Sequence, residues 1–191
     1  CIIGAGVIGL EFASIFTSFG SEVTVVEYAK EILPRFDSDM AKRLRQSLGK
    51  RGITITTQAA VSAIAQNGDE LTVTYTRKGK EETVVADKVL MAVGRRPNLA
   101  SLNLEEVGIE ATPRGVVVNE NMQTNVPHIY AIGDIIGGYM LAHAATFQGI
   151  RALNHIMGTP DKLNLNVMPA AVFTMPEAAT VGLTEDECKE K

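Results

Sequence analysis

Tryptophan is absent from the 191 residues, aromatic side chains make up only 5%, and cysteine occurs twice, as Cys1 and Cys188. Two cysteines at opposite ends of the chain form no disulfide framework, and they favour a reducing compartment. No uncharged apolar run reaches the roughly 18–20 residues that a bilayer span needs, and no basic segment precedes an apolar one at the N-terminus. We therefore expect a globular, cytoplasmic protein without a membrane partner.

Basic residues are not in excess either. Lysine and arginine total 18 against 22 acidic residues, which gives a net charge of −4. The cations are scattered, so there is no basic surface to hold a phosphate backbone, and nucleic acid is not expected as a partner. The 46% of hydrophobic residues can bury a substantial core, and the length allows one or two domains.

The chain opens on the stretch CIIGAGVIGL, which holds three glycines at the spacing of a dinucleotide-binding turn. A short strand over Cys1–Ile3 leads into Gly4, Gly6 and Gly9, and an apolar run of helical period follows from Val7 to Phe19. The first glycine of such a turn permits the bend, the second lets the backbone approach a pyrophosphate, and the third lets helix and strand pack closely. Three glycines can also serve packing alone, so assigning the motif to dinucleotide binding depends on the segments around it.

The segment after the helix supports the assignment to dinucleotide binding. Residues 21–27 are rich in β-branched side chains, which predicts a second strand buried on both faces and ending at Glu27. A carboxylate there can accept both hydroxyls of an adenosine ribose, whereas it would repel the 2′-phosphate of NADP(H). Lys30 is the nearest cation. The pattern predicts a βαβ unit that binds NAD(H) in preference to NADP(H).

The following segments extend an α/β pattern. The run Asp37-Ser38-Asp39 can cap a helix that runs to about Lys50, and turn signals at Asn67-Gly68 and Lys78-Gly79 indicate antiparallel hairpins. The expected strands are Ile53–Thr56, a meander over Ala60–Gln66, Leu71–Arg77 and Glu81–Ala86, and a buried strand over Lys88–Val93. The predicted fold class is α/β: a Rossmann-like domain with a parallel sheet, to which an antiparallel β-meander is added.

Glu11 lies in the first turns of the first helix, and two interpretations of it remain open. A carboxylate near a helix N-terminus is stabilised by the helix dipole without any further role. The alternative places it beside a bound cofactor.

Five motifs, which follow one another along the whole chain, resemble those of a known family. They are the glycine loop with Glu11 and Glu27, Gly94–Asn98, Thr124–Asp134, Met140–His143, and Phe173–Glu177 with Val181–Glu185. Together they resemble the flavin-dependent pyridine nucleotide-disulfide reductases, and within them the dihydrolipoamide dehydrogenase branch most closely. The resemblance implies FAD and NAD as cofactors, a dithiol or disulfide substrate, and a homodimer. It also implies that electrons pass from a dithiol to NAD+.

The resemblance also assigns residues. The glycine loop and Glu11 would bind NAD, Glu11 at the nicotinamide end, while Glu27 and Val61 would contact the adenosine side and Gly94 would lie beside the cofactor. Asp134 would hydrogen-bond the ribityl chain of FAD, after a strand over Ile129–Ile132, and the stretch 140–143 would lie at a helix N-terminus under the flavin pyrimidine. Val61 could instead be a core residue. The full set is Gly4, Ala5, Gly6, Val7, Ile8, Gly9, Glu11, Glu27, Val61, Gly94, Asp134, Met140, Leu141, Ala142 and His143, with no catalytic acid–base or metal ligand among them.

One departure weakens the branch assignment. Residues 144–149 read AATFQG, where dihydrolipoamide dehydrogenases often carry lysine and acidic residues. Mercuric reductase, coenzyme A disulfide reductase and NADH peroxidase therefore remain open, while the NADP-dependent glutathione and trypanothione reductases are disfavoured. A redox-inert NAD-binding module is the second functional class.

The resemblance further divides the chain into an NAD domain over 1–118, a returning segment of the FAD domain over 119–162, and the start of an interface domain over 163–191. The family's Cys-x-x-x-x-Cys redox pair and His-Glu acid–base pair have no counterpart in the sequence. We therefore expect the chain to be the central piece of a longer reductase. The motifs past Asn119 favour that enzyme over a plain NAD module, which has no use for flavin contacts.

Overall fold

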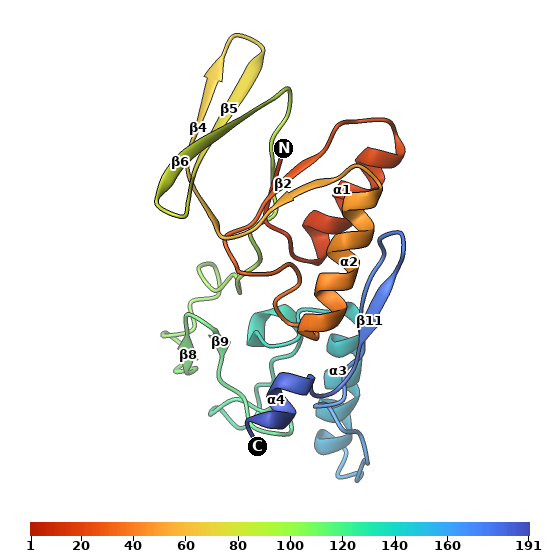
Figure 1. The fold of residues 1–191 in the computed structure, drawn as a ribbon. Coiled ribbons are helices and arrows are strands. Elements are labelled where there is room, and N and C mark those ends of the chain that lie inside the picture. The colour runs from red at the N-terminus through yellow and green to blue at the C-terminus, as the bar shows by residue number, and fades with distance from the viewer. The chain divides into compact units, whose positions relative to one another are not determined.

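The computed structural model describes residues 1–191, and the chain is drawn in Figure 1. It forms two compact units, one of Cys1–Gly94 with Pro169–Lys191 and one of Arg95–Met168. None of the helices has both the length and the apolar character that a bilayer crossing demands.

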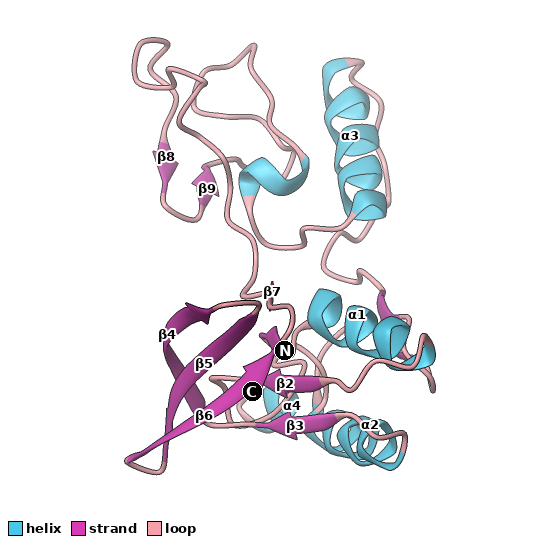
Figure 2. Cartoon of the chain, turned by 90° about the horizontal axis from the view of Figure 1, so that it is seen from above, coloured by secondary structure: helices cyan, strands magenta, loops and turns pink.

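The first unit is built around a parallel sheet of four short strands in the order β3-β2-β1-β7 (Figure 2). The strands are β1 (Ile2–Ile3), β2 (Thr24–Val26), β3 (Thr54–Thr56) and β7 (Leu90–Met91). Helix α1 (Val7–Ser18) joins β1 to β2, and α2 (Ser38–Lys50) joins β2 to β3. The predicted βαβ unit and Rossmann-like class are confirmed.

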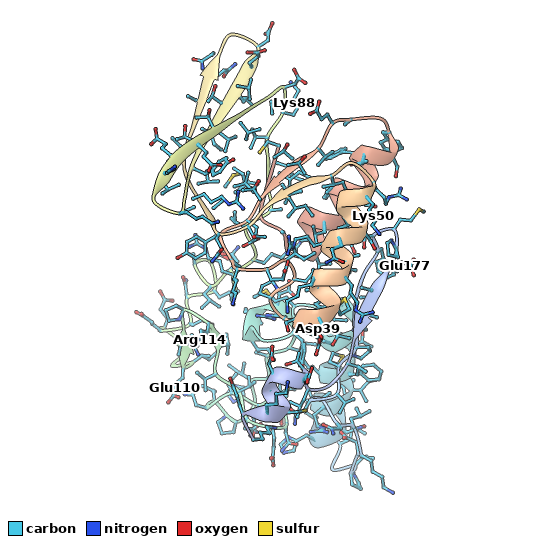
Figure 3. All side chains as sticks on the ribbon, viewed as in Figure 1. Asp39, Lys50, Lys88, Glu110, Arg114 and Glu177 are labelled. Carbon is cyan, nitrogen blue, oxygen red and sulfur yellow. The ribbon has the colours of Figure 1, made fainter.

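Helix α2 has a capping side chain at its N-terminus and a charged residue in both its first and its last turn. The Asp37 side chain caps it by accepting a hydrogen bond from the Asp39 N–H at 3.0 Å. Asp39 lies in the first turn and Lys50 in the last (Figure 3), so both charges complement the helix dipole. The inner face contributes Leu44 and Leu48 to a core shared with the sheet, and burial of each such side chain stabilises the fold by about 1.5–3 kcal/mol.

The antiparallel meander is confirmed in the same unit. Strands β4 (Ala59–Asn67), β5 (Glu70–Arg77) and β6 (Lys80–Ala86) form a separate three-stranded sheet, seen apart from the helices in Figures 1 and 2. The glycines of both predicted turns adopt the positive φ that such hairpins require, 64° at Gly68 and 74° at Gly79.

A C-terminal hairpin completes the first unit. Strand β10 (Ala170–Val172) pairs antiparallel with β11 (Ala178–Thr180), and a short helix α4 (Glu185–Lys189) follows. Val172 is fully buried in the same core as the parallel sheet. Residues distant in sequence from the glycine loop are therefore packed beside α1.

The second unit has little regular structure apart from one long helix. It contains the hairpin β8 (Ala111–Thr112) and β9 (Gly115–Val116), a 3-10 helix η1 (Gly133–Ile136), and α3 (Ala142–Ile156). Arg151 on α3 ties this unit together. Its guanidinium donates both to the carboxylate of Asp161, at 2.8 and 2.9 Å, and to the backbone oxygen of Glu120 at 3.1 Å.

Two sequence expectations about strands are wrong. Residues Ile129–Ile132 form no strand, because Tyr130 makes only an isolated bridge with Gln123. The strand expected over Lys88–Val93 is reduced to β7, and it is not buried: Met91 is 56% exposed. The physical reason is its position, since β7 pairs only with β1 and forms an edge of the sheet.

Candidate functional site

The glycine loop between β1 and α1 is packed so tightly that two of its glycines have no room for a side chain. Gly4 has φ of +105°, and a Cβ added there would lie 2.3 Å from the backbone oxygen of Ala92. A Cβ on Gly9 would lie 2.0 Å from the backbone oxygen of Gly4. These two residues bring the start of α1 directly against β1 and the residue after β7, as the bend and the close helix packing of the motif require.

Gly6 differs from its two neighbours. A Cβ added to Gly6 would meet no atom within 4 Å, so no packing within the chain requires glycine there. Gly6 is also the N-cap of α1, without a side-chain capping bond, and its carbonyl accepts the N–H of Leu10 at 3.1 Å. The N–H groups of the first turn are left for an external acceptor, which fits a pyrophosphate.

Glu27 follows β2 and reaches back to the loop. Its Oε2 accepts a hydrogen bond from the N–H of Ala5 at 2.5 Å, and its Oε1 accepts one from the N–H of Ala29 at 2.6 Å. A carboxylate offers about four acceptor positions, so further positions remain for ribose hydroxyls. Sequence reasoning missed the bond to the loop, which joins the acidic residue and the glycines into one structural element.

Glu11 lies in the second turn of α1, and the first turn contains no acidic residue. The dipole effect decays within the first turn, so it accounts poorly for this carboxylate. Glu11 Oε1 instead accepts a hydrogen bond from the N–H of Phe173 at 2.9 Å. The side chain thus links α1 to the end of β10, a contact between residues far apart in the sequence.

The other residues assigned to the nucleotide lie in different environments. Ala5 is fully buried, Val7 is half-buried, and Ile8 is exposed. Val61 is half-buried and packs against a small cluster of buried residues formed by Val26, Ala59 and Tyr75. Gly94 is exposed beyond β7, with φ of +109° and open space where a Cβ would be.

In the second unit, Asp134 lies in the first turn of η1. Its exposed carboxylate is 3.6 Å from Nη1 of Arg95. Helix α3 supports the turn, because the N–H of Gly133 donates to Oε1 of the buried Gln148 on α3 at 2.7 Å. This support fixes the backbone from which Asp134 projects.

The stretch 140–143 lies at the N-terminus of α3, as expected. Leu141 is the N-cap and makes no side-chain capping bond. Ala142 and His143 are exposed there, while Met140 and Leu141 are half-buried. An electron-rich ring edge fits such a helix end, because the N-terminal end of a helix carries partial positive charge.

Two polar residues in the second unit escaped the sequence analysis. The sequence analysis includes Arg95 only within the motif Gly94–Asn98, and it assigns no function to Gln148. A signal for Gln148 existed, since it lies four residues after Ala144 on the buried face of an amphipathic helix. No comparable pattern pairs Arg95 with Asp134, because that contact depends on how the segment after β7 folds.

Comparison with known proteins agrees with the resemblance. A family model described as pyridine nucleotide-disulphide oxidoreductase matches residues 1–149. A dihydrolipoyl dehydrogenase of Bacillus subtilis (strain 168) is 45% identical over 192 residues, covering 100% of this chain and 41% of that protein. A leghemoglobin reductase of Glycine max is 42% identical, covering 99% of this chain and 37% of that protein. The chain thus spans about two fifths of the length of these curated relatives.

Solved structures give the same result. LpdA from Mycobacterium tuberculosis matches with a TM-score of 0.88 and 34% identity, over 99% of this chain and 41% of that one. The HOCl-induced flavoprotein disulfide reductase RclA from Escherichia coli matches with a TM-score of 0.85 and 32% identity, over 100% of this chain and 43% of that one. The chain belongs to the pyridine nucleotide-disulphide oxidoreductase family.

Proposed function

We propose that this chain provides the NAD(H)-binding part, and one wall of the FAD site, of an NAD-dependent flavoprotein that oxidises dihydrolipoamide to lipoamide. Family membership supports the oxidoreductase class and the use of FAD with a pyridine nucleotide. The dihydrolipoyl dehydrogenases that match over the whole chain support this substrate.

For NAD(H), the proposed contacts follow the geometry of the first unit. The loop from Gly4 to Gly9 would receive the pyrophosphate on the free N–H groups of α1, and Glu27 would accept the adenosine ribose. Val61 would line the adenosine side, Gly94 would lie beside the cofactor, and Glu11 would lie at the nicotinamide end. The observation that carries this proposal is the open position at Gly6, where nothing in the chain itself requires glycine.

For FAD, the proposed contacts lie in the second unit. Asp134 would accept hydrogen bonds from the ribityl hydroxyls, and the stretch 140–143 would present the N-terminus of α3 to the flavin pyrimidine. When bound, FAD supplies two-electron transfer between a dithiol and the nicotinamide. The chain's own part is to position that ring and to stabilise negative charge on it through the positive end of the α3 dipole.

The test of NAD(H) binding is a calorimetric titration of NADH into the unmodified chain and into Gly6→Ala. Alanine at this position should leave the free energy of unfolding within about 1 kcal/mol, because its Cβ meets open space and only the N-cap preference changes. NADH affinity should fall at least about tenfold, since the Cβ occupies the approach of the pyrophosphate. Equal affinity of the two proteins would contradict the proposal.

A second candidate has a specific observation in its favour. Residues 144–149 depart from the pattern of the dihydrolipoamide branch, and RclA, a disulfide reductase of another description, matches in structure with a TM-score of 0.85, close to the 0.88 of LpdA. The chain could therefore provide the NAD(H)-binding module of another disulfide reductase, such as a mercuric or coenzyme A disulfide reductase. Comparing dihydrolipoamide with coenzyme A disulfide and Hg²⁺ as substrates of the whole protein separates these candidates.

The same proposal includes a homodimer and a cytoplasmic location for the whole protein. Both cysteines of this chain are free thiols, which supports a reducing compartment. We further propose that residues 1–118, 119–162 and 163–191 belong to the NAD, FAD and interface domains of the whole protein, as the motif order implies.

A further inference from the structure

The 3-10 helix η1, which carries Asp134, packs against β9 on one side and α3 on the other, and Figure 2 shows it between the two. The contact with β9 is made by backbone atoms. Gly115 in β9 has φ of +135°, and a Cβ added there would lie 2.6 Å from the backbone oxygen of Ile135. Gly137, directly after η1, is placed as tightly, because a Cβ there would overlap the backbone oxygen of Arg114. The hairpin of β8 and β9 therefore leaves η1 no room to shift toward it.

On the side of α3, one buried polar side chain holds η1. Gln148 is only 7% exposed, and its Oε1 accepts the N–H of Gly133 at 2.7 Å. Gly133 is itself buried, has φ of +76°, and lies so close to Ala145 that an added Cβ would be 3.3 Å from the Cβ of that residue. The bond fixes the peptide directly before Gly133. Loss of the acceptor would leave a buried N–H group unpaired, which folded proteins rarely tolerate.

The side chain of Asp134 has no comparable support. It is 50% exposed, and its ion pair with Arg95, at 3.6 Å, is exposed as well. Exposed ion pairs contribute little, so this pair does not fix where the carboxylate lies. The direction in which Asp134 projects is therefore set by the backbone of η1, and Gln148 holds that backbone.

We propose that Gln148 is a positioning residue for FAD, because by fixing the backbone at Gly133 it aims the Asp134 carboxylate at the ribityl chain. The inference rests on the proposed function, since it requires Asp134 to accept the ribityl hydroxyls. A carboxylate held in place before binding loses less conformational freedom on binding, so FAD affinity depends on Gln148 through Asp134. The amide also supports the turn without adding a second negative charge beside Asp134.

The first measurement uses the full chain without FAD and follows amide hydrogen exchange of Gly133 by NMR. Gln148→Met keeps a long side chain but removes the strong acceptor, so exchange at Gly133 should become at least about tenfold faster. Gln148→Glu keeps an acceptor oxygen in both of its protonation states and should retain slow exchange. Gln46→Met, which replaces an exposed glutamine of α2, should leave the rate unchanged. Unchanged exchange in Gln148→Met would overturn the inference.

The second measurement is the affinity of FAD for the whole protein after removal of its flavin, followed by flavin fluorescence. Gln148→Met should weaken FAD binding about tenfold, and Gln148→Glu should restore most of the affinity. A double-mutant cycle with Asp134→Ala separates positioning from a general structural role. In the Asp134→Ala background, Gln148→Met should cause no further loss, because no carboxylate is left to position.

Additive losses in the double variant would overturn the inference, since Gln148 would then support the fold and not Asp134. The same conclusion would follow if Asp134→Ala weakened FAD binding and Gln148→Met did not. If Asp134→Ala itself left FAD affinity unchanged, the proposed flavin contact would fail and this inference with it.

Discussion

The carboxylate of Glu27 and the backbone N–H of Ala5 are 2.5 Å apart from acceptor to donor, although the two residues belong to different ends of the βαβ unit. The bond explains why an acidic residue at the end of β2 matters before any nucleotide arrives. It holds the loop against β2 and fixes the carboxylate beside the loop, so two parts of the proposed nucleotide site are positioned by one contact.

Substitution of Gly9 by alanine should destabilise the fold. The added Cβ would lie 2.0 Å from the Gly4 carbonyl oxygen, and relief requires α1 to move away from the loop. We expect a loss of about 1–3 kcal/mol or more in the free energy of unfolding, measured by urea denaturation. Gly49→Ala in α2 is the control, because its Cβ meets open space and should stabilise the helix by about 0.5–1 kcal/mol. Equal stability of the two variants would refute the packing argument.

Removal of the Glu11 carboxylate should loosen the end of β10. Glu11→Ala leaves the N–H of Phe173 without its acceptor, so exchange of that amide with solvent should become faster, by about five- to tenfold for a bond worth about 1 kcal/mol. Amide hydrogen exchange followed by NMR measures this rate directly. Glu22→Ala, at an exposed position before β2, should leave the rate unchanged. Unaltered exchange in Glu11→Ala would disprove the link.

The stability of the chain should fall in acid partly through Asp161. Hydrogen bonds from the Arg151 guanidinium lower the pKa of this carboxyl, with further bonds from Leu163 and Asn154. A lowered pKa in the folded state means that the stabilisation is complete above the unfolded value of about 3.9 and is lost as pH falls through the folded value. Asp161→Asn should remove this part of the acid dependence between about pH 5 and 2, measured by denaturant unfolding. The exposed turn variant Asp69→Asn should keep it, and an unchanged profile in Asp161→Asn would contradict the prediction.

The sequence predicted local features well where a residue type is required by backbone geometry. Gly68 and Gly79 identified both hairpin turns of the meander, and the run Asp37-Ser38-Asp39 identified the start of α2. The glycine loop could be located because Gly4 and Gly9 are demanded by contacts between neighbouring elements. In each case the determining interaction lies within a few residues or within one βαβ unit.

Features that depend on distant contacts could not be predicted in this way. The apolar stretch Ile129–Ile132 has the composition of a strand, yet no neighbouring strand pairs with it beyond the single bridge at Tyr130. The contact of Glu11 with Phe173 joins residues from opposite ends of the chain, and no periodicity encodes it. The pair of Arg95 and Asp134 is of the same kind.

The chain alone should not oxidise a dithiol. Its only cysteines, Cys1 and Cys188, are free thiols, and the sequence holds no Cys-x-x-x-x-Cys pair. With saturating FAD, NAD+ and dihydrolipoamide, we expect no NADH formation above the rate without protein, followed by NADH absorbance. Turnover that disappears in Cys1→Ser or Cys188→Ser would contradict this expectation and would place the redox thiols within these residues.

The most direct test of the account is a comparison of NADH and NADPH binding by calorimetry on the unmodified chain and on Glu27→Arg. The Glu27 carboxylate should favour NADH by at least about tenfold, because a 2′-phosphate beside it adds repulsion and removes hydrogen bonds from the ribose. Arginine at this position should narrow or reverse the preference, since it attracts the phosphate. Equal affinity of the unmodified chain for the two nucleotides would contradict the assignment of Glu27 to the ribose, and with it the proposed NAD(H) site.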